Sequence, residues 1–316
     1  MNASFLFSQF MSGLSTAMLL FLIASGLSLV FGVMRVINFA HGSFYMVGAY
    51  IAWQLVHWLH PEGMGFWVAV LGAALGVALL GLAVERLFFR FLYGREELYQ
   101  LLFTYALVLI LGDVAKFLWG TQQLSVSTPP LLSGSVEIFG SIQPIYNLFM
   151  MVLGPVIAFV GWLVLNRTGV GRTVRAAQMD REMLDTLGSN VGTIYTSMFV
   201  VASFLAGLAG ALVTPIQSIV PGMDVLIIVQ AFIVVVIGGL GSLWGTFWGS
   251  VIYGEVYAFG IPIQQAMAPW LHDLILRWFD RDVPIDIQGF SLYAVYALMA
   301  VILIVRPWGL FGRPLR

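Results

Sequence analysis

Residues 167–190 read RTGVGRTVRAAQMDREMLDTLGSN, and they interrupt a chain that is otherwise strongly apolar. Charged side chains gather in this polar segment: Arg167, Arg172, Arg175, Asp180, Arg181, Glu182 and Asp185. Apolar residues still recur within it at helical spacing, namely Ala176, Met179, Met183 and Leu187. A short amphipathic helix of this kind lies on a membrane surface or docks in a groove of a partner. Because its arginines could also serve only to orient membrane spans, the apolar stripe is what favours a soluble partner.

The chain around this segment has the composition of a membrane protein. Its 316 residues are 60% hydrophobic and only 9% charged, whereas soluble domains are about 25% charged. Four stretches without any acidic or basic residue, 138–166, 186–223, 225–254 and 287–305, come close to or exceed the roughly 20 residues that cross a bilayer core. Their continuous apolar runs favour helices over barrel strands. The sequence therefore predicts an all-α polytopic membrane protein.

Nine segments are long and apolar enough to be membrane helices. They are 10–33, 38–58, 66–89, 98–119, 146–166, 193–215, 225–240, 243–260 and 289–305. Nine crossings place the N-terminus outside and the C-terminus inside, whereas eight crossings with one re-entrant segment place both ends inside. We expect one transmembrane domain over 1–316, with about eight or nine helices and a cytoplasmic loop at about 167–190.

The distribution of charge predicts which loops face the cytoplasm. Arginines cluster in the loop around residues 86–95, in the polar segment and at the C-terminus, and cytoplasmic loops carry an excess of basic residues. The polar loop 120–145, which contains Pro129 and Pro130, then lies outside. The acidic stretch 270–286 is also predicted to be an outer loop.

Two glycine-rich interruptions divide long apolar stretches, near 32–44 and near 234–250. Transporters often place broken or re-entrant helices at corresponding points around a central site, although glycines also let membrane helices pack closely. The same two readings, solute pathway or structural support, apply to the polar groups beside the first interruption. The candidate pathway residues are Asn38, Phe39, His41, Gly42, Gly238, Gly239 and Gly241.

Several kinds of chemistry are absent from the sequence. There is no cysteine, and the single lysine, Lys116, is followed by Phe117, so no phosphate-binding Gly-Lys-Ser/Thr loop exists. The four histidines lack the spacing of a metal site. Neither a catalytic residue nor a cofactor is expected in this chain, and nothing suggests nucleic acid as a partner.

Three carboxylates lie at or near the ends of apolar segments. Glu85 precedes Arg86, and Asp113 is one helical turn from Lys116, so both are interpreted as structural. Glu255 has no nearby basic residue in the sequence. It is the best candidate for a proton-linked carboxylate, and it is the basis of the alternative reading, an ion-coupled secondary transporter that works alone.

Four segments together resemble the permeases of branched-chain amino acid ABC importers: INFAHGSFYMVGAY (37–50), GRTVRAAQMDREMLDTLG (171–188), VVVIGGLGSLWGTFWGS (234–250) and RPWGLFGRP (306–314). The resemblance covers nearly the whole chain. It implies a multi-pass subunit of a bacterial inner-membrane importer, in contact with lipid, a second permease (identical or homologous), two cytoplasmic ATPases that hold ATP and Mg, and a periplasmic solute-binding protein.

The resemblance also implies a role for the polar segment. Its position matches the family's coupling loop, so ATPase contacts are implied at Gly171, Arg172, Arg175, Ala176, Asp180, Met183, Leu187 and Gly188. The more general Glu-Ala-Ala signature with a glycine four residues on is not matched, because residues 175–177 are Arg-Ala-Ala and the next glycine is Gly188. The implied solutes are branched-chain amino acids or relatives such as urea, short amides and aromatic acids.

Overall fold

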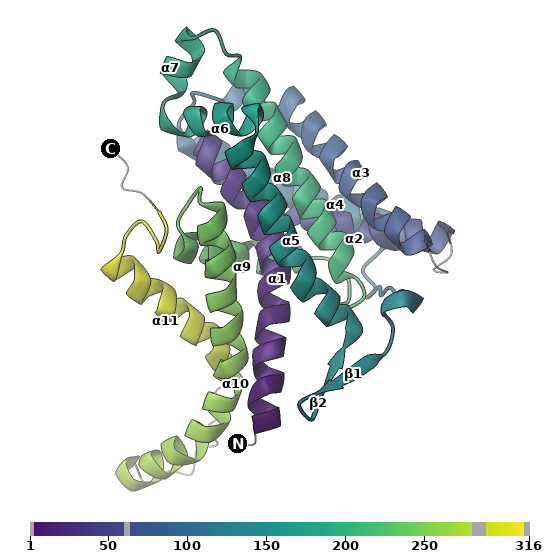
Figure 1. The fold of residues 1–316 in the computed structure, drawn as a ribbon, viewed down its shortest axis with the longest axis vertical. Helices are drawn as coiled ribbons and strands as arrows, with labels where there is room; N and C mark the ends of the chain where they lie inside the picture. Colours follow the sequence, from purple (N-terminus) through teal and green to yellow (C-terminus); the bar gives the residue numbers. More distant parts are fainter. Residues whose placement is uncertain (1–2, 60–63, 280–288, 313–316) are drawn as a thin grey trace.

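The computed structural model describes residues 3–59, 64–279 and 289–312, and helices dominate it (Figure 1). The long helices are α1 (Ala3–Met34), α2 (Ala40–Leu59), α3 (Gly65–Leu87), α4 (Glu97–Trp119), α5 (Ile145–Arg167), α8 (Val191–Val213), α9 (Met223–Gly238), α10 (Leu243–Phe279) and α11 (Phe290–Val305). Each of them overlaps one of the nine predicted segments. The predicted all-α polytopic class is therefore confirmed.

The remaining elements are short. They are the 3-10 turns η1 (Phe89–Leu92) and η2 (Pro130–Leu132), the strands β1 (Ser135–Ile138) and β2 (Ser141–Pro144), and the helices α6 (Gly169–Met179) and α7 (Arg181–Thr186). The antiparallel hairpin β1–β2 lies in the segment that the sequence predicts as a loop. Its turn has positive φ at both Phe139 and Gly140, as a type I′ two-residue hairpin turn requires. The sequence does not predict this turn, because phenylalanine is not a residue that favours it.

Within the described residues, five helices could cross a membrane by length and composition alone: α1, α3, α4, α5 and α8. A sixth candidate is the pair α9 and α10, which is bent by 116° at its break. The sequence predicts eight or nine helices because α2, which contains His41 and His57, and the 16-residue α11 also count there. Both predicted interruptions are present, since the chain is not helical from Arg35 to Asn38 and breaks again between α9 and α10.

The helix α10 is longer than the sequence predicts. It continues through Pro262 and Pro269 to Phe279 and extends away from the body of the molecule (Figure 1). The predicted outer loop 270–286 is therefore wrong up to residue 279, and its remaining residues lie outside the described part. A proline removes one helical hydrogen bond and bends a helix, but neighbouring elements often tolerate it in membrane helices.

The core is a set of helices that approach one another at glycines. α2, α3 and α8 pack against one another, and α1 packs against α10 and α8. A Cβ added at Gly48 would lie 2.6 Å from the Cα of Gly207, and one added at Gly210 would collide with the carbonyl oxygen of Tyr45. α2 and α8 therefore meet backbone to backbone, as membrane helices do through small residues. We call this contact the α2–α8 seam.

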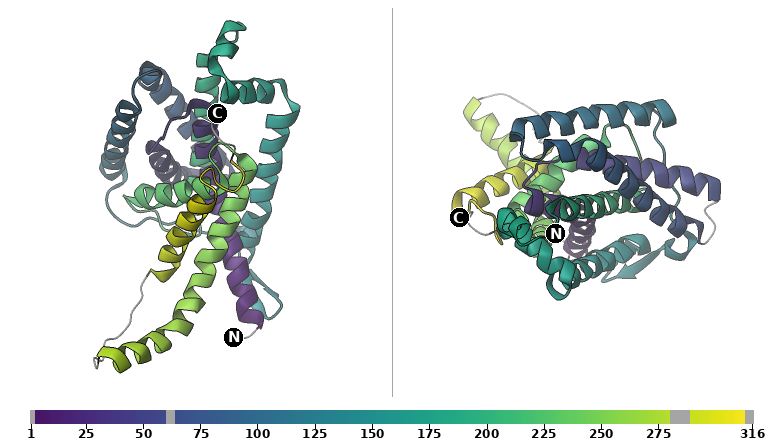
Figure 2. Two further views of the ribbon diagram at one scale, coloured as in Figure 1. Left: turned by 90° about the vertical axis from the view of Figure 1, so that its left-hand side faces the viewer. Right: turned by 90° about the horizontal axis from the view of Figure 1, so that it is seen from above.

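Two ends of the molecule are distinct. The helices α6 and α7 lie at one end, and the start of α1 lies at the other with the β1–β2 hairpin (Figures 1 and 2). Glu85 and Tyr93, beside the first arginine cluster, contact Thr196 and Tyr195 at the start of α8, which follows α7. The two basic regions thus share one end, as the positive-inside rule predicts.

Candidate functional site

The first interruption is a bend at which His41 is held inside the helix bundle. Arg35 ends α1 with a φ of 54°, and α2 starts again at Ala40. The Nε2 of His41 donates to the carbonyl oxygen of Ile23, 2.9 Å away in the middle of α1. This contact favours the structural reading of His41, because the ring ties α2 to α1. The side-chain amide nitrogen and oxygen of Asn38 are buried and have no hydrogen-bond partner among the described residues.

A buried acid next to this bend was missed by the sequence analysis. Asp224, in the first turn of α9, accepts a 2.7 Å hydrogen bond from the hydroxyl of Ser43 and is only 3% exposed. The carbonyl oxygen of Asp224 also lies against Gly42. The sequence does contain an indication of this site, because Asp224 is the single charged residue between the uncharged stretches 186–223 and 225–254. Ionisable residues inside membrane proteins are costly and usually functional.

The second interruption joins α9 to α10 through glycines with positive φ. Gly239 has a φ of 106° and Gly241 a φ of 80°, values that only glycine adopts without strain. A Cβ on Gly238 would collide with the carbonyl oxygen of Gly245 across the bend. A Cβ on Gly32, in the last turn of α1, would lie 2.8 Å from the Cα of Gly241. The two interruptions therefore touch.

The predicted pathway residues do not form one cluster. Gly42 lies at the N-terminal end of α9 beside Asp224, whereas Gly238, Gly239 and Gly241 lie at its C-terminal end. A helix of 16 residues is about 24 Å long. The chain from Gly32 to Gly42 thus runs along α9 from one end to the other. Phe39 points its ring at Phe232 of α9, with the ring centroids 5.6 Å apart.

The predicted amphipathic helix is two helices in the structure. α6 ends at Met179 because Asp180 is extended, with φ −152° and ψ 103°, and its side chain caps α7 by accepting from the Met183 amide. Thr168 caps α6 in the same way, accepting from the amide of Gly171. Such caps satisfy amides that a helix start leaves free. The prediction of a single amphipathic helix in the polar segment was wrong, because Asp180 caps the start of a second helix.

The apolar stripe of these helices points outward. Met179, Met183 and Leu187 are 81%, 58% and 74% exposed, while Val174, Ala177 and Leu184 form the buried face. We call residues 168–188 the coupling segment. Gly188 ends it with a φ of 80°.

The other predicted contact residues differ in exposure. Arg172 and Asp180 are exposed, and Arg175 and Ala176 are half-buried. Gly171 is buried against the carbonyl oxygens of Val164 and Leu165, so its role lies in the corner between α5 and α6. One guanidinium nitrogen of Arg175 is buried and has no hydrogen-bond partner within the described residues.

The carboxylates at the helix ends have different surroundings. Asp113 and Lys116 form the predicted ion pair at 3.1 Å, and both are exposed. Glu85 is buried and accepts from the hydroxyls of Tyr93 and Thr196, each at 2.8 Å, so its partners are not the adjacent Arg86. Burial and the hydrogen bond to Glu85 raise the pKa of the Tyr93 phenol, which therefore remains the donor.

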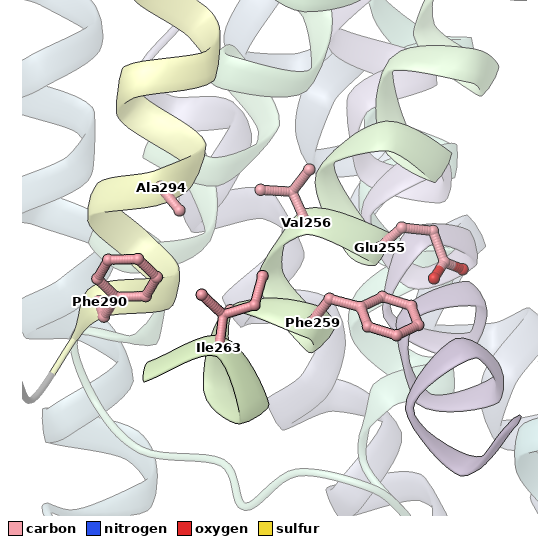
Figure 3. A pocket seen from close by; sticks show the side chains of 7 residues that line it. Glu255, Val256, Phe259, Ile263, Phe290 and Ala294 are labelled. Carbon is pink, nitrogen blue, oxygen red and sulfur yellow. The ribbon is translucent and has the colours of Figure 1, made fainter. Parts of the chain in front are cut away.

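Glu255 lies beside an apolar crevice between α10 and α11, of about 300 Å³. Val256 and Ile263 face Phe290 and Ala294 across it, while the Glu255 carboxylate turns away from them (Figure 3). That carboxylate lies close to Gly13 of α1. Neither of its oxygens has a hydrogen-bond partner among the residues described.

Comparison with known proteins places these features in a family. The family model described as "Branched-chain amino acid transport system / permease component" matches residues 9–279. The chain is 28% identical to the high-affinity branched-chain amino acid transport system permease protein BraD of Pseudomonas aeruginosa, over 97% of this chain and 95% of BraD. It is 26% identical to the permease protein LivH of Escherichia coli K12, over 99% of this chain and 98% of LivH.

A further relative is LivM of Escherichia coli K12, a permease protein of the same kind of system, which is 24% identical over 93% of this chain and 68% of LivM. No solved structure matches the chain significantly. Its relatives are transport permeases rather than enzymes, and its apolar helices suit a multi-pass inner-membrane protein. The chain belongs to the family of branched-chain amino acid transport system permease components.

Proposed function

We propose that this chain is the permease subunit of an ATP-driven importer, and that it moves branched-chain amino acids or a related small solute inward by alternating access. The family and the names of the relatives support this class of solute. ATP and Mg are bound by separate ATPase subunits, because this chain lacks a phosphate-binding loop. A second permease, which can be homologous or identical, completes the membrane unit, and a periplasmic binding protein delivers the solute.

The observation that carries the proposal is the exposed apolar stripe of the coupling segment. Met179, Met183 and Leu187 are exposed at an end of the molecule where the neighbouring loops are basic. Exposed apolar side chains on a short helix, rimmed by charges, are typical of a surface that binds a protein groove. An ATPase that grips this stripe would pull on the start of α8 and the end of α5.

Force applied there has a short route to the interruptions. α6 packs against the end of α1, and the side-chain nitrogen of Gln178 lies 2.9 Å from the position of a Cβ on Gly32. Gly32 in turn touches Gly241. By linkage, the coupling segment must bind the ATPase differently in the two states of the permease, because otherwise no conformational preference is transmitted.

The alternative function is an ion-coupled carrier that works without an ATPase. The observation that favours it is the Glu255 carboxylate, whose buried oxygens have no hydrogen-bond partner in the described part of the chain. Under this alternative, solute uptake depends on an ion gradient and is lost when Glu255→Gln removes the titratable group.

The experiment that separates the two functions is a mild detergent purification of the chain from its native membrane, followed by mass spectrometry and reconstitution in liposomes. Recovery of a stoichiometric protein with a phosphate-binding loop, together with uptake that requires ATP, supports the importer. Recovery of the chain alone, with uptake driven by an ion gradient in the absence of ATP, contradicts it.

A further inference from the structure

The C-terminal segment Arg306–Gly312, which reads RPWGLFG, folds back onto the break between α9 and α10. The amide of Leu310 donates to the carbonyl oxygen of Ile237, and the amide of Phe311 donates to that of Gly238, each at 2.9 Å. These carbonyls belong to the last turn of α9, where a helix has no bonding partners of its own. The segment therefore acts as a cap that comes from 73 residues further along the chain.

The C-terminal segment rests on the backbone of glycine residues, and we call this contact of Gly309 and Gly312 with Gly239 the seat. A Cβ on Gly309 would lie 2.6 Å from both the nitrogen and the Cα of Gly239, and a Cβ on Gly239 would lie 2.8 Å from the Cα of Gly312. Gly309 and Gly239 also have φ values of 76° and 106°. Only glycine allows both the conformation and the approach, so the two backbones are fitted to each other.

The same junction includes the coupling segment. Two residues beyond Gly239, Gly241 touches Gly32 of α1, and Gln178 of α6 lies against Gly32. A series of contacts thus leads from α6 through the end of α1 to Gly241 in the break, and the C-terminal segment contacts the same break at Ile237, Gly238 and Gly239.

We propose that residues 306–312 are a clamp that joins α9, α10 and α11 into one moving body, with Gly309 and Gly239 as its positioning residues. The inference rests on the proposed function, because it assigns the clamp a part in converting ATP hydrolysis into transport. α9 bends by 116° into α10, and a bend with free carbonyls would yield when α6 pushes on it. With the clamp in place, the push moves α9 and α10 together.

The first test is Gly309→Ala in the assembled complex with its ATPase and binding protein, reconstituted in liposomes. The control is Gly120→Ala, because Gly120 has a similar φ of 80° but no atom lies within 4 Å of its added Cβ. The readout is the number of solute molecules moved per ATP hydrolysed. We expect roughly a tenfold fall for Gly309→Ala and no change for Gly120→Ala. A normally assembled Gly309→Ala complex with the wild-type ratio overturns the clamp.

A second measurement does not depend on whether Gly309→Ala assembles, nor on transport. Because the chain has no cysteine, spin labels can be attached to Cys residues introduced by Leu240→Cys and Phe311→Cys, two exposed positions on the two sides of the seat. The clamp predicts one narrow distance distribution that is the same in the nucleotide-free and ATP-bound complexes. A broad distribution, or one that shifts between the two states, overturns it.

The two measurements also keep this inference separate from the proposed function. If the wild-type complex neither hydrolyses ATP nor needs it for uptake, the proposed function fails, and the clamp's role in coupling fails with it. If the wild-type complex couples ATP to uptake but the spin-label distance varies between states, the clamp alone is wrong.

Discussion

The α2–α8 seam and the coupling segment each use the uncharged side of a helix, but the seam is buried whereas the apolar stripe of the coupling segment is exposed. In the seam the backbones of Gly48, Gly207 and Gly210 leave no room for a side chain. In the coupling segment the side chains of Met183 and Leu187 are exposed, and no described residue packs over them fully. The seam is therefore buried within this chain, whereas the coupling segment keeps an exposed apolar surface, which the proposed function assigns to the ATPase.

A side chain placed in the seam is expected to have the largest effect. Gly210→Leu puts a Cβ onto the carbonyl oxygen of Tyr45, so α2 and α8 must separate, at a cost of about 3 kcal/mol or more. The measurement is the unfolding temperature and the yield of monodisperse protein in detergent. Gly112→Leu on α4 is the matched control, since no atom lies within 4 Å of its added Cβ. Equal loss in both variants would break the comparison, because lipid exposure rather than the seam would then explain it.

A charge placed in the coupling segment is expected to spare the fold and stop the coupling. Leu187→Asp buries an unpaired carboxylate in the proposed ATPase groove, which reduces ATPase activity stimulated by the binding protein by about tenfold or more. Arg175→Glu is expected to act in the same direction. The control is Leu131→Asp, because Leu131 is 80% exposed on the opposite end. Wild-type stimulation in a fully assembled Leu187→Asp complex contradicts the role of the stripe.

Tyr93 donates to Glu85, which also accepts from Thr196 at the start of α8, so this contact helps to fix α8 beside the coupling segment. Tyr93→Phe removes the hydroxyl that donates to Glu85, while Thr196 still donates to the other carboxylate oxygen. We expect a loss of about 1 kcal/mol in the free energy of unfolding. Tyr105→Phe on α4, an exposed tyrosine, serves as the control. A loss that disappears when Glu85→Gln is already present assigns the effect to this pair.

The smallest effect is expected at the exposed pair of Lys116 and Asp113. Both side chains are more than half exposed, and such pairs contribute about 0.5 kcal/mol or less. Lys116→Ala should therefore leave the unfolding temperature unchanged and should not alter ATPase stimulation. A larger change in either measurement would show that surface charge, and not only the apolar stripe, matters on the outside of this molecule.

The sequence predicted best those segments whose structure follows from one local property, such as a long apolar run or a cluster of glycines. Long apolar runs predicted the ends of α3, α4, α5 and α8 within two residues, whereas α1 begins at Ala3 instead of residue 10. Lipid forces such a run to satisfy its backbone hydrogen bonds as a helix. Glycine clusters predicted both interruptions. The coupling segment was recognised by its charge and by its three-and-four spacing. Of the predicted stripe, Met179, Met183 and Leu187 are exposed, whereas Ala176 is half-buried.

The sequence was less informative about where a helix ends. The break at Asp180 depends on one side chain that accepts from the Met183 amide, and a capping aspartate inside a helical pattern competes with continuation of the helix. α10 likewise ends at Phe279 instead of near residue 260, because the folded protein continues the helix through Pro262 and Pro269.

The sequence alone was enough to establish that the protein lies in a lipid membrane, how many apolar segments it has and in what order, and which family it resembles. Those properties are local, because each depends on residues within one or two turns of one another. The contacts of Asp224 with Ser43, of Gly32 with Gly241 and of Gly309 with Gly239 became visible only in the folded structure. These contacts join residues far apart in the chain, and their partners are chosen by how closely helix backbones can approach, which no single segment encodes.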